Sequence, residues 1–287
     1  MNNATLLFLG TGTSEGVPRV SCLTHPEKHC EVCHDAIKVG SPNRRRNTSI
    51  LISKTLKNKK KLNVLIDVGK FFYESSMNWF PLNTIKTIDA IVLTHSHADA
   101  VGGLDDLRDW TNNTQDIIKV YLRKTDLTSI SRSYDYLVDR SKQTGGGGVA
   151  NLKFNVIDHK PFKVCGIKFT PLPVIHGPTQ LANGYRFGNV TYISDTSSIP
   201  PETQNLISGS EILILDALRP RKTHGTHFTL EEAIAFTRTV KPNKTLFTDA
   251  AHDVNHIQIN DYLKKFLRSE NLDMQYAHDG QKLQIKL

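Results

Sequence analysis

The chain of 287 residues lacks any apolar run of about 18 residues, so no transmembrane helix is expected. Its first residues, Met1 to Phe8, carry no positive charge, and their apolar stretch is too short for a signal peptide. We therefore expect a cytoplasmic protein and leave a nuclear location open. Only four cysteines are present, and in a reducing compartment we expect free or metal-bound thiols rather than disulfides.

Acidic residues are outnumbered, with 28 Asp and Glu against 36 Lys and Arg and a formal net charge of +8. This balance favours an anionic partner, such as a phosphate ester or nucleic acid. Part of the charge lies between Lys57 and Lys61, which we interpret as a solvated hairpin tip. We interpret Arg44, Arg45 and Arg46 as a solvated turn, with phosphate contacts as the alternative.

Short apolar runs alternate with helical patterns along the chain. Strands are predicted near residues 5–9, 48–53, 62–67, 89–93, 117–122, 152–157, 167–172, 184–187, 190–194, 211–215, 244–247 and 282–285. Helices are predicted near residues 103–110, 125–137, 201–207, 230–240 and 257–269. This order fits an α/β fold with two sheets packed face to face and helices outside. No repeat or boundary divides the chain, so residues 1–287 are expected to form a single domain.

The most informative motif is the run from Thr94 to Ala100, which follows a predicted buried strand and reads H-x-H-x-D. Residues i and i+2 of an extended segment point the same way, so His95 and His97 can bind one metal ion. Asp99 lies close enough in sequence to serve a second ion. The alternative is a pair of histidines on a surface loop.

Further metal-type residues follow other apolar strands: Asp67, His176, Asp195 and Asp249, with His252 three residues beyond the last. A single such residue is usually a turn former or a helix cap. Their recurrence predicts ligands gathered from several strand ends around one cavity, which is how a rigid scaffold preorganises a metal centre.

Three cysteines lie in one early segment, and Cys30 and Cys33 form a C-x₂-C pair with Cys22 nearby. A closed tetrahedral zinc site needs one further donor. The local candidates are the histidines at positions 25, 29 and 34, and the alternative is three free thiols.

These residues together resemble a metallo-β-lactamase-fold hydrolase, similar to the cyclic phosphodiesterase of bacterial phosphonate degradation and its eukaryotic relatives. The matching segments are residues 7–18, 65–69, 93–99, 103–108, 171–176, 194–196 and 226–227. The resemblance implies a four-layer αββα sandwich with metals at one edge of the sheets.

The resemblance also implies roles for individual residues. His95, His97 and His176 would bind a first metal, Zn²⁺ or Mn²⁺, and Asp195 would bridge to a second metal bound by Asp99 and Asp249. His252 would complete a structural Cys₃His zinc site with Cys22, Cys30 and Cys33. His227 would contact the phosphoryl group or donate a proton to the leaving group, and His224 beside it is a second candidate for binding substrate.

Two positions depart from the family pattern, because Ala100 and Asp249 stand where the family has histidines. The second metal site therefore retains carboxylates alone, which suit Mn²⁺ or Mg²⁺ better than Zn²⁺. The second metal is accordingly expected to be different, weakly bound or absent.

The expected reaction is hydrolysis of a phosphodiester bond in a small or cyclic phosphate ester by metal-bound hydroxide. Asp99 and His227 are the expected catalytic residues. One alternative is an RNA-processing endonuclease of the same superfamily, which the lack of a long tRNA-gripping insertion disfavours. Another is a non-catalytic metal-binding scaffold. The expected partner is a small anionic substrate, ahead of nucleic acid, and a homodimer is left open.

Overall fold

The computed structural model describes residues 3–143, 145 and 148–287 and contains two mixed sheets. The order of the strands in the first sheet is β14 (Lys282–Lys286), β1 (Asn3–Gly10), β2 (Ser49–Thr55), β3 (Lys61–Ile66), β4 (Ala90–Val92), β5 (Ile118–Arg123) and β6 (Leu152–Ile157). The order in the second sheet is β13 (Met274–Tyr276), β12 (Lys244–Thr248), β11 (Ile212–Asp216), β10 (Val190–Ile193), β9 (Leu181–Phe187), β8 (Ile167–Ile175) and β7 (Phe162–Val164).

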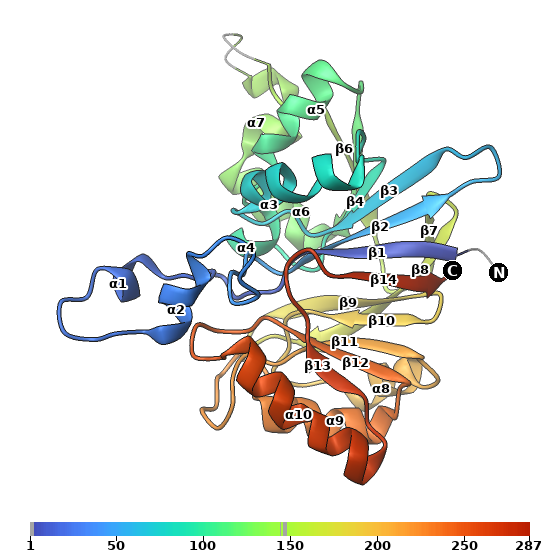
Figure 1. Cartoon of the computed structure of the whole chain (residues 1–287). Helices are drawn as coiled ribbons and strands as arrows, with labels where there is room; N and C mark the ends of the chain where they lie inside the picture. The colour runs from blue at the N-terminus through green and yellow to red at the C-terminus, as the bar shows by residue number, and fades with distance from the viewer. Residues whose placement is uncertain (1–2, 144, 146–147) are drawn as a thin grey trace.

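Helices cover the outer face of each sheet (Figure 1). Those by the first sheet are α3 (Phe72–Trp79), α4 (Ala98–Val101), α5 (Arg108–Asn113), α6 (Lys124–Ser133) and α7 (Asp135–Val138), with short 3₁₀ turns at Pro81–Asn83, Asp105–Leu107 and Arg140–Lys142. Those by the second sheet are α8 (Pro201–Ile207), α9 (Leu230–Val240) and α10 (His256–Glu270). The predicted αββα sandwich is confirmed.

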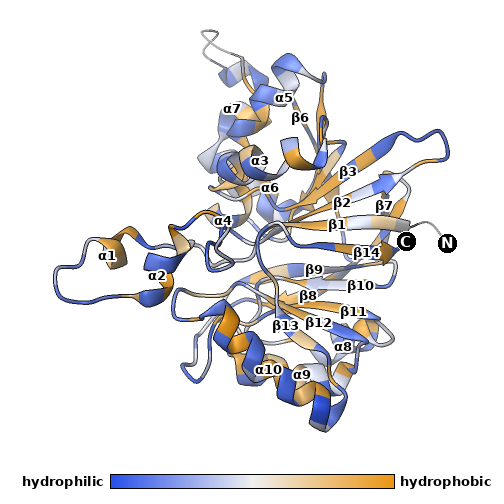
Figure 2. Ribbon diagram, viewed as in Figure 1, coloured by the Kyte–Doolittle hydropathy of each residue, from blue (hydrophilic) through white to orange (hydrophobic). Residues whose placement is uncertain are grey.

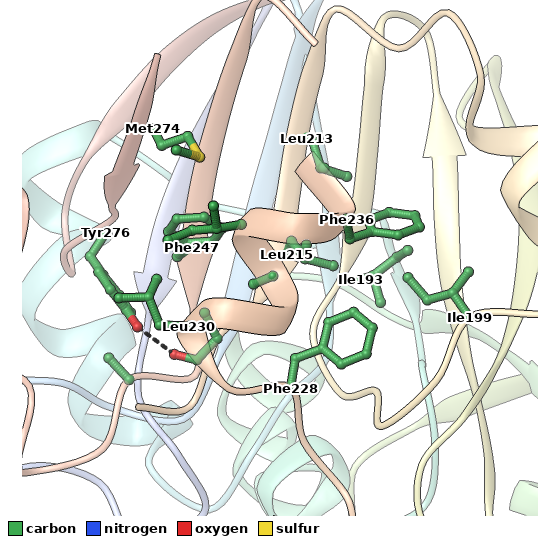
Figure 3. Packing of buried hydrophobic residues seen from close by; sticks show 14 of the residues in the cluster. Ile193, Ile199, Leu213, Leu215, Phe228, Leu230, Phe236, Phe247, Met274 and Tyr276 are labelled. Carbon is green, nitrogen blue, oxygen red and sulfur yellow. Dashed lines mark hydrogen bonds between the residues drawn. The ribbon is translucent and has the colours of Figure 1, made fainter. Parts of the chain in front are cut away.

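Apolar residues fill three layers. The central layer lies between the sheets, where Phe8 and Ile52 of the first sheet belong to the same buried cluster as Tyr185 and Ile214 of the second. Each outer layer joins one sheet to its helices. Figure 2 shows the apolar colouring concentrated along the strands, and Figure 3 shows α9 packed on the second sheet, with the Tyr276 hydroxyl donating to the Ala217 carbonyl at 2.9 Å.

The predicted strands are present, but the sequence did not predict β7, β13 or α3. The two strands have three residues each, too few for an alternating pattern to emerge. Helix α3 buries only Phe72, Ser75 and Ser76, so its inner face is largely polar in sequence. The helix predicted at residues 125–137 is divided between α6 and α7, with Tyr134 between them.

A small lobe projects from the sandwich and contains α1 (Val20–Leu23) and α2 (Glu31–Ala36) (Figure 1). Behind it, the expectation of a solvated arginine turn is wrong for Arg45, whose side chain is 0% exposed. Its guanidinium donates to the carbonyls of Ala251 (3.0 Å) and Val254 (2.8 Å). Arg46 forms an ion pair with Glu74.

Among the described residues, no helix is long and apolar enough to cross a membrane.

Candidate metal centre

The strand ends meet at one edge of the sandwich, and most candidate ligands lie there. His95 and His97 follow β4, His176 follows β8, Asp195 follows β10 and Asp249 follows β12. The parallel strands β10, β11 and β12 present their carboxyl ends at the same edge. The prediction that ligands converge from several strand ends agrees with this arrangement.

Asp67 fixes the start of the histidine motif. Its carboxylate accepts hydrogen bonds from the backbone N–H of Thr94 (2.8 Å) and from the Thr94 hydroxyl (2.7 Å). Two residues on, Gly69 allows close approach, because a Cβ there would lie 2.0 Å from the carbonyl oxygen of Asp99. The segment Asp67–Gly69 therefore packs directly against the motif that bears His95 and Asp99.

Hydrogen bonds set the tautomers of two histidines. The Thr94 hydroxyl gives its proton to Asp67, so its oxygen accepts from Nδ1 of His95 at 2.9 Å. The Nδ1 of His176 donates to the carbonyl of Thr226 at 2.8 Å, because a carbonyl oxygen can only accept. In the neutral imidazole, these hydrogen bonds leave Nε2 unprotonated, and this is the form in which imidazole binds a metal.

The side chains of His95, His97 and His176 form one group, whose ligand atoms lie within 4.8 Å of one another. The Nε2 of His176 lies 3.3 Å from the Nδ1 of His97. Two nitrogens that each lie about 2.05 Å from one tetrahedral ion are separated by about 3.3 Å, so the pair already has the spacing of shared ligands.

A histidine–aspartate pair, His227 with Asp216, lies beside this group. His227 precedes α9, and its Nδ1 donates to Asp216 at 2.9 Å, which leaves Nε2 as its free ring nitrogen. Asp216 also accepts from the backbone N–H of Thr196 at 2.9 Å. The ligand atoms of His176, Asp195 and His227 lie within 4.8 Å of one another, and so do those of Asp216, His227 and Asp249.

Burial and neighbouring charges govern the titration of the centre. Burial lowers the pKa of His95 to about 3, so its imidazole is neutral. Burial alone would lower the pKa of His227, but the charge and hydrogen bond of Asp216 outweigh it and raise that pKa to about 9. Burial together with the charge of Asp195 raises the pKa of Asp99 to about 6, and the same two causes raise the pKa of Asp249. These two carboxylates thus lack sufficient positive charge around them.

The three carboxylates expected to hold the second metal do not form a group of their own within 4.8 Å in the described part of the chain. Asp99 lies nearer the three histidines, with its Oδ1 3.7 Å from Nε2 of His95. Asp249 is instead grouped with Asp216, a residue that the sequence analysis missed. The predicted strand 211–215 stopped one residue short of it, and the same strand-end rule would have found it.

His224 lies at the rim of the centre. Its side chain is exposed, its Nδ1 lies 2.9 Å from the Thr226 hydroxyl, and its ring centroid is 5.3 Å from that of His227. Burial, helped by the charge of His227, lowers the pKa of His224.

The cysteines of the projecting lobe meet a histidine from far along the chain. The Nδ1 of His252 lies 3.4, 3.5 and 3.8 Å from the sulfurs of Cys22, Cys30 and Cys33. Ligands of a tetrahedral zinc, with bonds of about 2.3 Å to sulfur and 2.05 Å to nitrogen, place these atoms about 3.6 Å apart. The local alternatives do not join the group, since His29 and His34 stack on each other and His25 accepts from the backbone of Glu27 and Lys28.

The Cys₃His group and the group of residues at the strand ends both fit a bound cation. The Cys₃His set has the composition and spacing of a structural zinc site. At the strand ends, Nε2 of His95 is buried without a hydrogen-bond partner in the described structure, as are single oxygens of Asp99, Asp216 and Asp249. Buried polar atoms are normally paired, so such a set of open lone pairs fits a cation.

Comparison with known proteins agrees with this geometry. Residues 62–248 match the family model described as the beta-lactamase superfamily domain. The crystal structure of a diphosphatase from the PhnP family is 32% identical, covers 99% of this chain and 98% of its own, and has a TM-score of 0.79. Zn²⁺-bound PqqB from Methylobacterium extorquens is 17% identical, with a TM-score of 0.70 and coverage of 97% of this chain and 99% of its own.

Human tRNase Z, short form, shares the fold at 15% identity, with a TM-score of 0.61. The match covers 99% of this chain and 100% of the tRNase Z chain. A curated relative from Porphyromonas gingivalis, named octanoyltransferase, is 32% identical over 229 residues, or 79% of this chain. The match spans only 42% of that relative's length. From the matched domain and the sandwich, the chain belongs to the beta-lactamase superfamily, as a metallo-β-lactamase-fold hydrolase that resembles the PhnP family.

Proposed function

We propose that this chain is a metal-dependent phosphodiesterase that hydrolyses a small or cyclic phosphate ester. The observation that carries the proposal is the group of His95, His97 and His176, whose open nitrogens converge beside Asp195 and His227. The 32% identity to a PhnP-family diphosphatase across nearly the whole chain supports phosphoester chemistry.

Both ends of the chain contribute to the scaffold, which supports a single hydrolase domain over residues 1–287. Strand β14 pairs with β1, so that Leu6 lies opposite Leu283. The group of cysteines near the start is completed by His252 near the end.

His95, His97 and His176 would hold the first cation, Zn²⁺ or Mn²⁺, with Asp195 as a further ligand. When bound, such a cation lowers the pKa of a coordinated water and stabilises negative charge on phosphoryl oxygens. Thr94 and the carbonyl of Thr226 keep two of the imidazoles in the required tautomer.

His227 would act on the leaving group. Asp216 holds its Nδ1, so Nε2 is the atom that can contact a phosphoryl oxygen or pass a proton to the departing alcohol oxygen. The raised pKa of about 9 keeps the imidazole protonated at neutral pH, as a proton donor requires. His224 at the rim would contact the substrate, and nearby Arg219 and Lys222 would attract an anion.

The assay compares bis(p-nitrophenyl) phosphate, a diphosphate diester and a precursor tRNA with a 3′ extension as substrates. We expect release of p-nitrophenol that a chelator abolishes and that His227→Gln reduces by a factor of about 10² to 10⁴. The matched control is His159→Gln, at an exposed histidine in the β6–β7 turn, which should retain the full rate.

The same panel separates the alternatives. Preferred cleavage of the diphosphate diester would assign a diphosphatase activity like that of the PhnP-family relative, and cleavage of the tRNA alone would assign the RNA endonuclease. A protein that binds metal and cleaves none of the three substrates would contradict the proposal and favour a metal-binding scaffold.

A further inference from the structure

Basic side chains gather at the edge of the sandwich opposite the metal centre, where β7 and the C-terminus lie away from the projecting lobe (Figure 1). Lys168, near the start of β8, is separated from His176 by nearly the whole strand, or about 26 Å at about 3.3 Å per residue. A cavity of about 380 Å³ at this edge is lined in part by Lys54, Lys168 and Arg186. No aspartate or glutamate of the described chain lines it.

The register of the second sheet places three cations in a row on one face. Lys163 of β7 lies directly opposite Lys168 of β8, and Thr170 of β8 lies opposite Arg186 of β9. Residues i and i+2 of a strand point to the same face, so the row crosses three strands. Like charges directly opposite each other are destabilising. In the described part of the chain, none of the three forms an ion pair with a carboxylate, that of Leu287 included.

Lys54 adds a buried charge to the same cavity. Ile50 and Ile52 of β2 belong to the central apolar layer, and Lys54, two residues further along, points the same way. Lys54 is 8% exposed, and its Nζ donates to the carbonyl of Gly166 at 3.2 Å. An ammonium group has three N–H donors, and a buried charge is costly unless it is paired. Lys54 therefore retains donors for an anion in the cavity that it lines.

Arg186 presents the edge of its guanidinium that suits a phosphoryl group. Its Nη1 donates to the carbonyls of Leu206 and Ser208, each at 2.7 Å, which fixes the orientation of the group. Within the described structure, Nε and Nη2 have no acceptor, and together they form an edge that can bind two phosphoryl oxygens. The hydroxyl of Thr170, which also lines the cavity, is a further donor.

We propose that this cavity binds a small free phosphate ester, whose phosphoryl oxygens contact Lys54, Lys168 and the Nε–Nη2 edge of Arg186. Its volume of about 380 Å³ is that of a site for a small organic molecule. A phosphate monoester carries about two negative charges at neutral pH, which the unpaired cations balance. The burial of Lys54 favours a ligand that enters the cavity over an RNA that contacts only the exposed lysines. The site is independent of the proposed hydrolysis.

Isothermal titration calorimetry with glucose 6-phosphate tests the proposal on the full chain with its metals bound. Binding that persists at unchanged affinity in His95→Ala lies outside the metal centre. Lys54→Met and Lys168→Gln should each weaken this binding at least about tenfold, because each removes a charge-assisted hydrogen bond. The matched control is Lys57→Gln, at an exposed side chain in the β2–β3 hairpin of the same edge, which should retain the wild-type affinity.

The side chain of Lys168 is exposed, so Lys168→Gln keeps the proposal testable if Lys54→Met does not fold. Absence of binding to the wild type would overturn the proposal, and so would binding that His95→Ala abolishes and Lys168→Gln leaves unchanged. Equal weakening by Lys57→Gln and Lys168→Gln would show diffuse attraction to a charged edge and would also overturn it. Tighter binding of a short single-stranded RNA, with the same equal weakening, would assign the edge to nucleic acid instead.

Discussion

Replacing Arg45 with methionine should lower the free energy of unfolding far more than replacing an arginine of a solvated turn would. Its guanidinium donates to the carbonyls of Ala251 and Val254 at 3.0 and 2.8 Å and to the side-chain oxygen of Asn43 at 3.3 Å. Burial lowers the pKa of Arg45 to about 10, so the group is still charged at neutral pH.

The magnitude follows from these bonds. Hydrogen bonds from a charged donor contribute about 1.5–3 kcal/mol each, and a carbonyl left buried without a donor costs about 1–3 kcal/mol. Removing the charge also relieves the desolvation of the guanidinium, which offsets part of the loss. Arg45→Met, which keeps most of the apolar volume, should therefore lower the free energy of unfolding by about 2–4 kcal/mol.

Urea unfolding at fixed metal concentration measures this change, because bound metal itself shifts stability. Arg44→Met is the matched control, since Arg44 is only half-buried and contacts the lobe carbonyls of Ala36 and Ile37. It should lose less than about 1 kcal/mol, as is usual for surface substitutions. A loss of that small size in Arg45→Met as well would refute the reasoning.

Three further predictions concern the metal sites and acid stability. His176→Ala should abolish hydrolysis and first-site metal binding with unchanged circular dichroism, because the residue follows a strand end; a wild-type rate would contradict this. Stability should fall as the pH drops from about 6.5 to about 4. One cause is His256, whose pKa is lowered to about 4 by burial, so that the unfolded imidazole gains a proton which the folded one does not. His256→Gln should flatten that slope in urea titrations, and an identical slope would count against it. Cys30→Ser should remove one zinc per chain by elemental analysis and lower the unfolding midpoint, whereas Cys165→Ser should keep the zinc; equal zinc in both would exclude the cysteine site.

The sequence predicted best those features that depend on a local pattern of residues. The two sheets followed from short apolar runs that alternate with helical patterns. The helix predicted at 230–240 is present, and Thr229 and Glu232 form a capping box at its start. His95 and His176 come together because β4 and β8, which belong to different sheets, both end at the edge where the metal centre lies.

What the sequence could not predict depends on distant contacts. Arg45 looks like any surface arginine until the chain 206 residues later supplies its acceptor at Ala251. The pairing of Asp216 with Asp249 likewise depends on the β11–β12 register, which no local pattern fixes. The net charge also indicated an anionic partner. Composition alone could not separate Lys222, which lies near the metal centre, from the lysines of the β2–β3 hairpin.

The wide separation of the Cys₃His residues has a consequence for biosynthesis. Cys22, Cys30 and Cys33 lie 230, 222 and 219 residues before His252. During translation at about 5–20 residues per second, the three thiols leave the ribosome more than about ten seconds before their histidine partner exists. Throughout that interval the nascent chain carries an unfinished thiol cluster, so its maturation depends on the reducing capacity of its surroundings.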